Sequence, residues 1–168
     1  SDLERIDAGV DIILLTVPVP HDDAENVAVI ACDSNGKRAA VVTDLGEVTT
    51  ELISHLKNCN HISIEANYDH DRLMRGGYPD SLKRRVSGRG GHLSNYQTAK
   101  ALQEIVHPEL HSIVLCHLSE SNNLPHIAES EVLMGICDSF DGSLSISKQE
   151  GPDFSNWIGQ SNPERIVA

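Results

Sequence analysis

Residues 37–65 read KRAAVVTDLGEVTTELISHLKNCNHISIE, and this stretch decides the fold class. The β-branched and small apolar side chains of 37–43 predict a strand. Leucine and isoleucine recur at helical spacing across 49–56, behind a threonine that suits the N-cap position, so a helix is expected there. A short apolar strand follows at 61–65. A strand, a helix and a strand in succession indicate an α/β domain.

The same alternation extends along the chain in both directions. An Asn-Gly pair at 35–36 predicts a hairpin turn before the first of the strands described above. Further strands are expected over 10–19, 26–32, 112–116 and 144–147, and further helices over 69–74, 79–86, 94–106 and 124–133. No biased linker interrupts them. We therefore expect one α/β domain over residues 1–150, followed by a weakly patterned tail over 151–168.

Composition excludes several protein classes. The chain has 168 residues, of which 39% are hydrophobic and 23% charged, as in ordinary globular domains. No apolar run reaches the roughly 20 residues that a membrane span needs. The four cysteines, at positions 32, 59, 116 and 137, form no C-x-x-C pair. Buried thiols in a reducing cytoplasm are therefore expected, with no membrane association.

Charge is distributed unevenly. The net charge of −12 argues against a nonspecific coat for nucleic acid. Six of the thirteen basic residues nevertheless fall within an eighteen-residue basic stripe, composed of Arg72, Arg75, Lys83, Arg84, Arg85 and Arg89. The stripe is either a solvated helix face or a surface that holds a polynucleotide backbone.

Three polar side chains come directly after apolar strands. His21 follows TVPVP, Asp44 follows AAVVT, and His117 follows IVLC. In α/β sheets, ligands and catalytic groups collect at the carboxyl ends of strands. Imidazole and carboxylate groups are the usual ligands of zinc and similar divalent ions. Each residue alone could be a structural histidine or a turn aspartate, but the three together predict a metal site.

Three more segments could contribute to such a site. Glu65 also ends a strand, either as a catalytic carboxylate or as part of the following helix cap. His92 lies in the glycine-rich turn GGHLSN, whose backbone N–H groups could bind an anion or could simply be capped by Ser94. The cluster SESNN over 119–123 could bind an anion in the same way.

The order of these motifs resembles the metallo-β-lactamase superfamily. VPHD, VTDLG and LCHLS are similar to its third, fourth and fifth metal-binding motifs. EANYD, GGYP with LKRRV, GHLSN and HLSESNN look like the small bacterial exonuclease-like branch, which is related to tRNA 3′-processing enzymes. The resemblance covers about residues 10–150.

The superfamily's fold is a four-layer αββα sandwich, and this chain resembles its C-terminal half: a mixed sheet with helices packed on it. The superfamily's signature H-x-H-x-D-H is absent, since the chain contains no H-x-H. The chain is thus expected to be either a fragment of a longer protein or a degenerate relative.

The resemblance implies a mechanism based on two divalent metal ions, zinc or manganese, that activate a water molecule. His21 would bind one ion, His117 the other, and Asp44 would bridge them. His92 would contact the scissile phosphate or protonate the leaving group, oriented by Glu65. Substrate phosphates would meet Ser94, Asn95, Ser119, Asn122, Arg84 and Arg85.

These expectations define a leading function and two alternatives. The leading one is a phosphodiesterase or nuclease in the cytoplasm; the alternatives are a hydrolase of a small ester, thioester or lactam, and a metal-free binding or structural module. Because this chain supplies only part of the ligand set, weak or no metal binding is expected from it alone. A homodimer or a complementary N-terminal half is expected to complete it.

Overall fold

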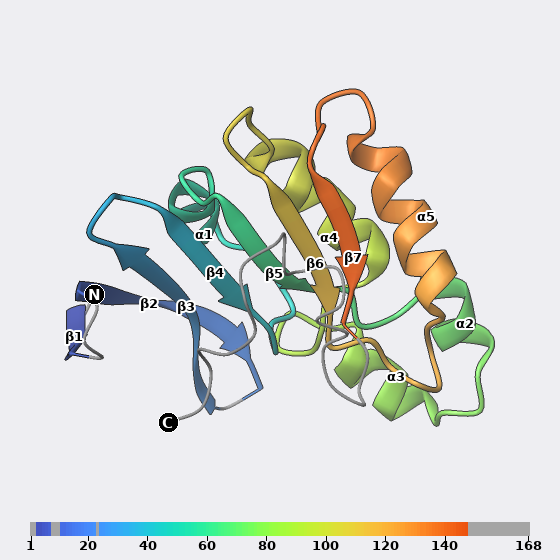
Figure 1. Ribbon diagram of the computed structural model, residues 1–168. Helices are drawn as coiled ribbons and strands as arrows, with labels where there is room; N and C mark the ends of the chain where they lie inside the picture. Colours follow the sequence, from blue (N-terminus) through green and yellow to red (C-terminus); the bar gives the residue numbers. More distant parts are fainter. Residues whose placement is uncertain (1–2, 8–10, 23, 148–168) are drawn as a thin grey trace, which may run out of the picture.

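A seven-stranded mixed sheet forms the centre of the protein (Figure 1). The computed structural model describes residues 3–7, 11–22 and 24–147. In spatial order the strands are β1 (Leu3–Asp7), β2 (Asp11–His21), β3 (Ala24–Asp33), β4 (Arg38–Val42), β5 (His61–Glu65), β6 (Ser112–Cys116) and β7 (Ser143–Ile146). The strands from β1 to β4 pair antiparallel, and those from β4 to β7 pair parallel.

Five helices connect the strands. They are α1 (Thr50–Leu56), α2 (His70–Arg75), α3 (Asp80–Val86), α4 (Asn95–Ile105) and α5 (Pro125–Ile136). Thr49 caps α1 through a hydrogen bond from Leu52 N, as the sequence predicts. The predicted strands and helices are confirmed, with two differences: α5 continues three residues past 133, and β1 was not predicted.

The hydrophobic core lies on one face of the sheet, under α1, α4 and α5 (Figure 1). Alternate strand residues point into it, because side chains along a strand alternate between faces. The largest fully buried side chains include Ile30, Ile62, Ile64, Ile113 and Leu115 from the strands and Leu52, Leu56, Leu102 and Ile105 from the helices.

The opposite face of the sheet is apolar but less covered. Val41 is 54% exposed and pairs with Val29 of β3, and Val27 of the same strand is 40% exposed. In Figure 1, α1 and α4 lie behind the sheet and α5 lies beside β7, so none of the three is drawn across this face. Among the described residues, therefore, one apolar sheet face has no helix packed on it.

Strand direction brings four strand ends to a single edge of the sheet. β2 and β4 are both antiparallel to β3, so they run the same way, and β5 and β6 are parallel to β4. The carboxyl ends of β2, β4, β5 and β6 therefore meet at one edge. His21, Asp44, Glu65 and His117 lie at these ends.

The structure does not test the predicted C-terminal limit of the domain. The proposed boundary at residue 150 and the tail over 151–168 lie outside the described residues.

Among the described helices, none combines the length and the apolar character that crossing a membrane requires.

Candidate metal centre

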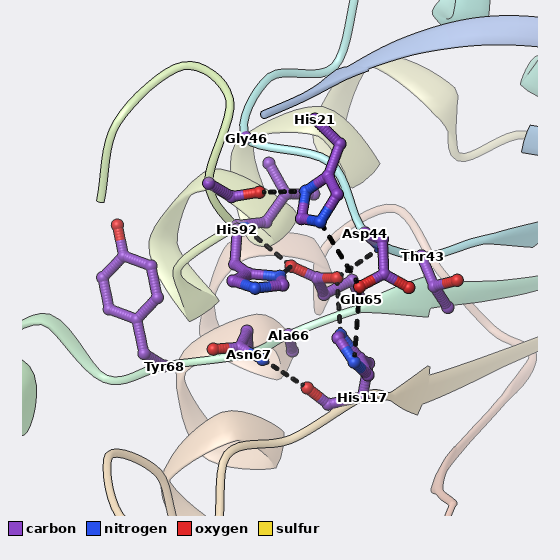
Figure 2. Close-up of polar contacts among 12 residues, drawn as sticks. His21, Thr43, Asp44, Gly46, Glu65, Ala66, Asn67, Tyr68, His92 and His117 are labelled. Atoms are coloured by element: carbon purple, nitrogen blue, oxygen red, sulfur yellow. Dashed lines mark hydrogen bonds and ion pairs between the residues drawn. The ribbon is translucent and has the colours of Figure 1, made fainter. Parts of the chain in front are cut away.

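The carboxylate of Asp44 lies between two imidazole rings (Figure 2). Its Oδ1 atom is 3.8 Å from Nε2 of His21 and 3.5 Å from Nε2 of His117. The structure thus brings together three residues that are far apart in the sequence, each with a potential ligand atom directed at the same small space.

Hydrogen bonds fix which nitrogen of each ring faces that space. His21 Nδ1 is 2.9 Å from the carbonyl oxygen of Gly91, and His117 Nδ1 is 2.8 Å from Oε2 of Glu65. Both partners are acceptors, so each Nδ1 carries the proton and donates it. Each Nε2 is then left with its lone pair, the tautomer in which histidine binds a metal.

Glu65 is the centre of the hydrogen-bond network and is 0% exposed. Its carboxylate accepts from the backbone N–H of Asp44 at 2.6 Å and of Leu93 at 2.8 Å. It also accepts from His117 Nδ1 and, at 3.1 Å, from His92 Nδ1. Burial favours a higher pKa for Glu65, but the hydrogen bonds from His117 and His92 outweigh it and hold the pKa below its usual range. Glu65 is therefore an ionised, fully paired buried carboxylate.

The same contact affects His117. Its hydrogen bond to Glu65 raises the pKa of the imidazole, against a smaller opposing effect of burial, and the charge of Asp44 adds to the rise. A ring beside two carboxylates is also an electron-rich ligand, because the acceptor at Nδ1 increases the basicity of Nε2.

The backbone adopts a rare conformation at two of these residues. Asp44 and His117 each have φ of 55°, in the left-handed region that side chains other than glycine seldom occupy. Such strain persists where the surroundings hold it in place. An asparagine amide binds each carbonyl: Asn26 Nδ2 donates to Asp44 O at 2.6 Å, and Asn67 Nδ2 donates to His117 O at 2.8 Å.

A glycine-rich loop between α3 and α4 fixes the position of His21. A Cβ added at Gly91 would lie 2.2 Å from the carbonyl oxygen of Val86, so only glycine fits there. The neighbouring Gly90 carbonyl accepts from Asp22 N at 2.6 Å. These close approaches attach the end of β2 to the loop, and the Gly91 carbonyl can then hold the His21 ring.

His92 completes the cluster. Its ring centroid is 5.0 Å from that of His21 and 5.2 Å from that of His117. Four potential ligand atoms, one each from Asp44, Glu65, His92 and His117, lie within 4.8 Å of one another.

The donor set suits divalent metal ions. The two free Nε2 atoms and the Asp44 oxygen are the ligand types that zinc and similar ions prefer, and Gly91 and Glu65 supply the outer hydrogen bonds that such ligands usually have. The residues present therefore fit a divalent metal centre.

The four predicted hydroxyl and amide ligands for phosphate separate into two pairs. Ser119 and Asn122 line a cavity beside His92 and His117. Ser94 instead forms a capping box with Gln97 at the start of α4. Asn95 is 0% exposed and exchanges hydrogen bonds of 3.1 and 2.8 Å with Asn123. Ser94 and Asn95 thus stabilise the fold beneath the site, and the structure does not place them at its surface.

Three of the six residues of the basic stripe form ion pairs with acidic residues. Arg85 lines the cavity, but its guanidinium pairs with Asp22 at 2.7 Å, which lowers the pKa of that carboxyl. Arg75 pairs with Asp71, and Arg89 pairs with Glu47. Arg84 is exposed, and its side chain forms no ion pair or hydrogen bond with another described residue. Of the two predicted phosphate-binding arginines, only Arg84 is unpaired in this part of the chain.

Sequence reasoning missed the supporting residues. Asn26 and Asn67 were not expected to contribute, and Gly91 was expected only to expose backbone N–H groups to an anion. Asn67 lies two residues past the end of β5, so its position after a strand was an available signal. Asn26 lies inside β3, and nothing in its sequence neighbourhood indicates that it reaches across to Asp44.

Comparison with known proteins identifies sequence relatives of one kind. The chain is 34% identical over 122 residues to the exodeoxyribonuclease YycJ of Bacillus anthracis, a match that covers 73% of this chain and 46% of YycJ. It is 35% identical over 92 residues to the exodeoxyribonuclease WalJ of Streptococcus pneumoniae, covering 55% of this chain and 34% of WalJ. The chain thus spans less than half the length of these relatives. No family model matches it.

Solved structures share the fold at low sequence identity. A diphosphatase of the PhnP family matches 87% of this chain and 43% of its own, with a TM-score of 0.53 and 12% identity. Zinc-bound PqqB from Methylobacterium extorquens matches 86% of this chain and 47% of its own, with a TM-score of 0.54 and 16% identity. Both alignments cover nearly all of this chain and about half of the other, which agrees with the expectation of half a sandwich.

Proposed function

Because the chain belongs to the metallo-β-lactamase superfamily, in its exonuclease-like branch, we propose that it is part of a metal-dependent phosphodiesterase that cleaves nucleic acid. The observation that carries the proposal is the convergence of His21 and His117 on Oδ1 of Asp44. The names of the sequence relatives favour a nuclease among the hydrolases that this fold supports.

The geometry supports one assignment of the metal-binding roles. His21 would hold one divalent ion and His117 a second, and Asp44 would contact both. Zinc or manganese bound there would supply a water molecule with a pKa of about 7 and would stabilise charge on a phosphate. The Gly91 carbonyl accepts from Nδ1 of His21, and Glu65 accepts from Nδ1 of His117. The ligand atoms therefore keep their orientation without an incoming metal having to order them.

A proton for the leaving group would come from His92. Its Nδ1 donates to Glu65, and a protonated ring would present Nε2–H toward the substrate. The Glu65 carboxylate holds the ring by its Nδ1, which leaves Nε2 for a general acid's proton transfer. The leaving oxygen receives the proton from Nε2, and His92 becomes neutral.

Substrate phosphates would contact the rim of the site. Ser119 and Asn122 offer a hydroxyl and an amide to the scissile phosphate alone, and Arg84 offers a positive charge to a neighbouring phosphate on an exposed part of α3. Contacts of this kind position a phosphodiester without reading its sequence.

The complete assembly would need a second half. The exposed apolar face around Val27 and Val41 suits another β-sheet, from a complementary N-terminal half or from a second copy of this chain. Since this half offers only part of a ligand set, we expect the isolated chain to bind metal weakly or not at all. The four cysteines are free thiols, which supports a reducing location such as the cytoplasm.

Hydrolysis of bis-p-nitrophenyl phosphate by the complete gene product, with added manganese, tests the proposal. We expect Asp44→Ala to lower kcat/KM by more than about a hundredfold, since a ligand shared by both ions is lost. Asp138→Ala, at an exposed position after α5, serves as the control. Activity that survives Asp44→Ala, or a protein that cleaves a thioester or a lactam but no phosphodiester, would contradict the proposal.

A further inference from the structure

A cavity of about 470 Å³ opens beside the candidate metal centre. His92 and His117 form its inner end, so anything bound in the cavity would lie next to the reacting group. One wall comes from α3 and the loop before it, and the other comes from the loop after β6. Its volume falls in the range of about 300 to 1,000 Å³ that is typical of sites for small ligands.

The two walls differ in chemistry. Tyr78, Leu82 and Val86 give the α3 wall an aromatic ring and two aliphatic side chains, all partly exposed. Such a surface suits a flat, apolar group.

The opposite wall carries several uncharged polar side chains. Ser119, Ser121 and Asn122 contribute hydroxyl and amide groups. Asn67 adds an acceptor: its Nδ2 is used by the carbonyl of His117, and no described residue donates to its Oδ1, which Figure 2 draws on the side away from His117. This wall can therefore both donate and accept hydrogen bonds.

The charges of the cavity do not favour a second phosphate. Arg85 is the sole cation among the lining residues, apart from the histidines, and it is paired with Asp22. Glu120 adds a further negative charge at the lining. A polyphosphate or the next phosphate of a strand would meet net negative charge here, whereas a neutral group would not.

We propose that this cavity seats an unpaired nucleoside bonded to the scissile phosphate, with the base on the Tyr78 wall and its polar edge, with the sugar, on the serine and asparagine wall. A nucleoside is neutral, has a flat face and carries both donors and acceptors, as the two walls require. A base held inside the cavity cannot be paired in a duplex, so the substrate is single-stranded at this position. The proposal rests on the proposed phosphodiesterase function.

Two esters with the same leaving group test it in the complete gene product. Thymidine 5′-(p-nitrophenyl phosphate) carries a nucleoside, and bis-p-nitrophenyl phosphate does not. We expect the protein to prefer the thymidine ester, and Tyr78→Ala to lower the ratio of the two kcat/KM values by about tenfold, as loss of an aromatic stack typically does.

Matched variants separate stacking from other effects. Tyr78→Phe keeps the ring and should keep the ratio, as should Tyr96→Ala, which removes a 58% exposed tyrosine of α4 outside the cavity. If Tyr78→Ala does not fold, Tyr78→Leu removes the aromatic face while filling most of the space. The protein could hydrolyse both esters while Tyr78→Ala and Tyr78→Leu leave the ratio of the two kcat/KM values unchanged. That result would overturn the nucleoside site but not the proposed function. Failure to hydrolyse either ester would overturn the proposed function, and this inference with it.

Discussion

Glu65 connects more parts of the site than any other described residue. Its two oxygens receive hydrogen bonds from the ends of β4 and β6 and from the loop that leads into α4. A buried carboxylate is costly to desolvate, and here four donors compensate for that cost. The residue therefore contributes to stability as well as to the orientation of His92 and His117.

Glu65→Gln should destabilise the fold. The amide NH₂ would face groups that are themselves donors, leaving at least one of them unpaired in the interior. We expect the free energy of unfolding in urea, measured without metal, to fall by about 3 kcal/mol. Glu104→Gln, on the exposed side of α4, is the control and should change it by less than about 0.5 kcal/mol. Equal stability of the two variants would show that the network contributes nothing.

Two asparagines, here called the asparagine clamps, support the backbone of the candidate metal ligands. Asn26 and Asn67 hold the carbonyls of two left-handed residues that carry metal-facing side chains. Asn67→Ala and Asn26→Ala should each weaken manganese binding to the complete gene product by about tenfold, because the ligand side chain is no longer held at its angle. Calorimetric titration measures this.

Asn58→Ala is the matched control for the clamps. Asn58 is exposed at the end of α1, and its amide contacts the carbonyl of Ser54. The two clamp variants could show a lowered melting temperature but the same metal affinity as the unsubstituted protein. That result would assign Asn26 and Asn67 to folding alone.

Among the elements, the α3–α4 loop determines where the end of β2 lies. Gly91→Ala would push a methyl group into the backbone of Val86 and Arg85, so the loop must move. We expect weaker metal binding through displacement of His21, together with a lower melting temperature.

Gly77→Ala is the control for this loop. An added Cβ at Gly77 meets nothing within 4 Å. Its melting temperature and metal affinity should stay near those of the unsubstituted protein. A Gly91→Ala protein that behaves like Gly77→Ala would contradict the role of the loop.

The packing of α1 predicts cysteine reactivity. Cys59 follows α1 and is fully buried, and burial raises its pKa to about 11. At pH 8, Cys59 should resist iodoacetamide in the folded protein, while Cys137 should react. Cys137 is exposed, which differs from the expectation that the cysteines are buried. The thiolate is the reactive form, so any Cys59 labelling should rise as the pH approaches 11. Peptide mass spectrometry that finds equal labelling of both residues at pH 8 would contradict this packing.

For the helices and strands, the periodicity of apolar residues in the sequence was sufficient to predict most of the fold. Alternating or continuous apolar runs predicted β2 to β7, because those strands bury a face. β1 was not predicted because LERID shows no alternation of apolar and polar residues. The polar residues at strand ends were found because strand direction alone brings them to one edge.

Other features depended on long-range packing. Asn95 looked like an anion ligand beside a cap, but a partner 28 residues away takes its amide. Arg85 belonged to a basic stripe, yet Asp22, 63 residues earlier, neutralises it. Local sequence carries no information about such partners.

For the whole molecule, the main feature is a half-sandwich that carries part of a metal-ligand set at one edge of its sheet. One face of the sheet is buried under helices, and the other exposes valines. The matches to about half of each related structure agree with this arrangement. The proposed chemistry depends on one claim: a divalent metal ion binds at the edge of the sheet where Asp44 lies.

A crystal of the complete gene product soaked in zinc, with anomalous diffraction recorded at the zinc edge, shows whether metal binds there. We expect anomalous density about 2.0 to 2.2 Å from Nε2 of His21, from Oδ1 of Asp44 and from Nε2 of His117. Zinc bound elsewhere, with these three side chains uncoordinated, would contradict it.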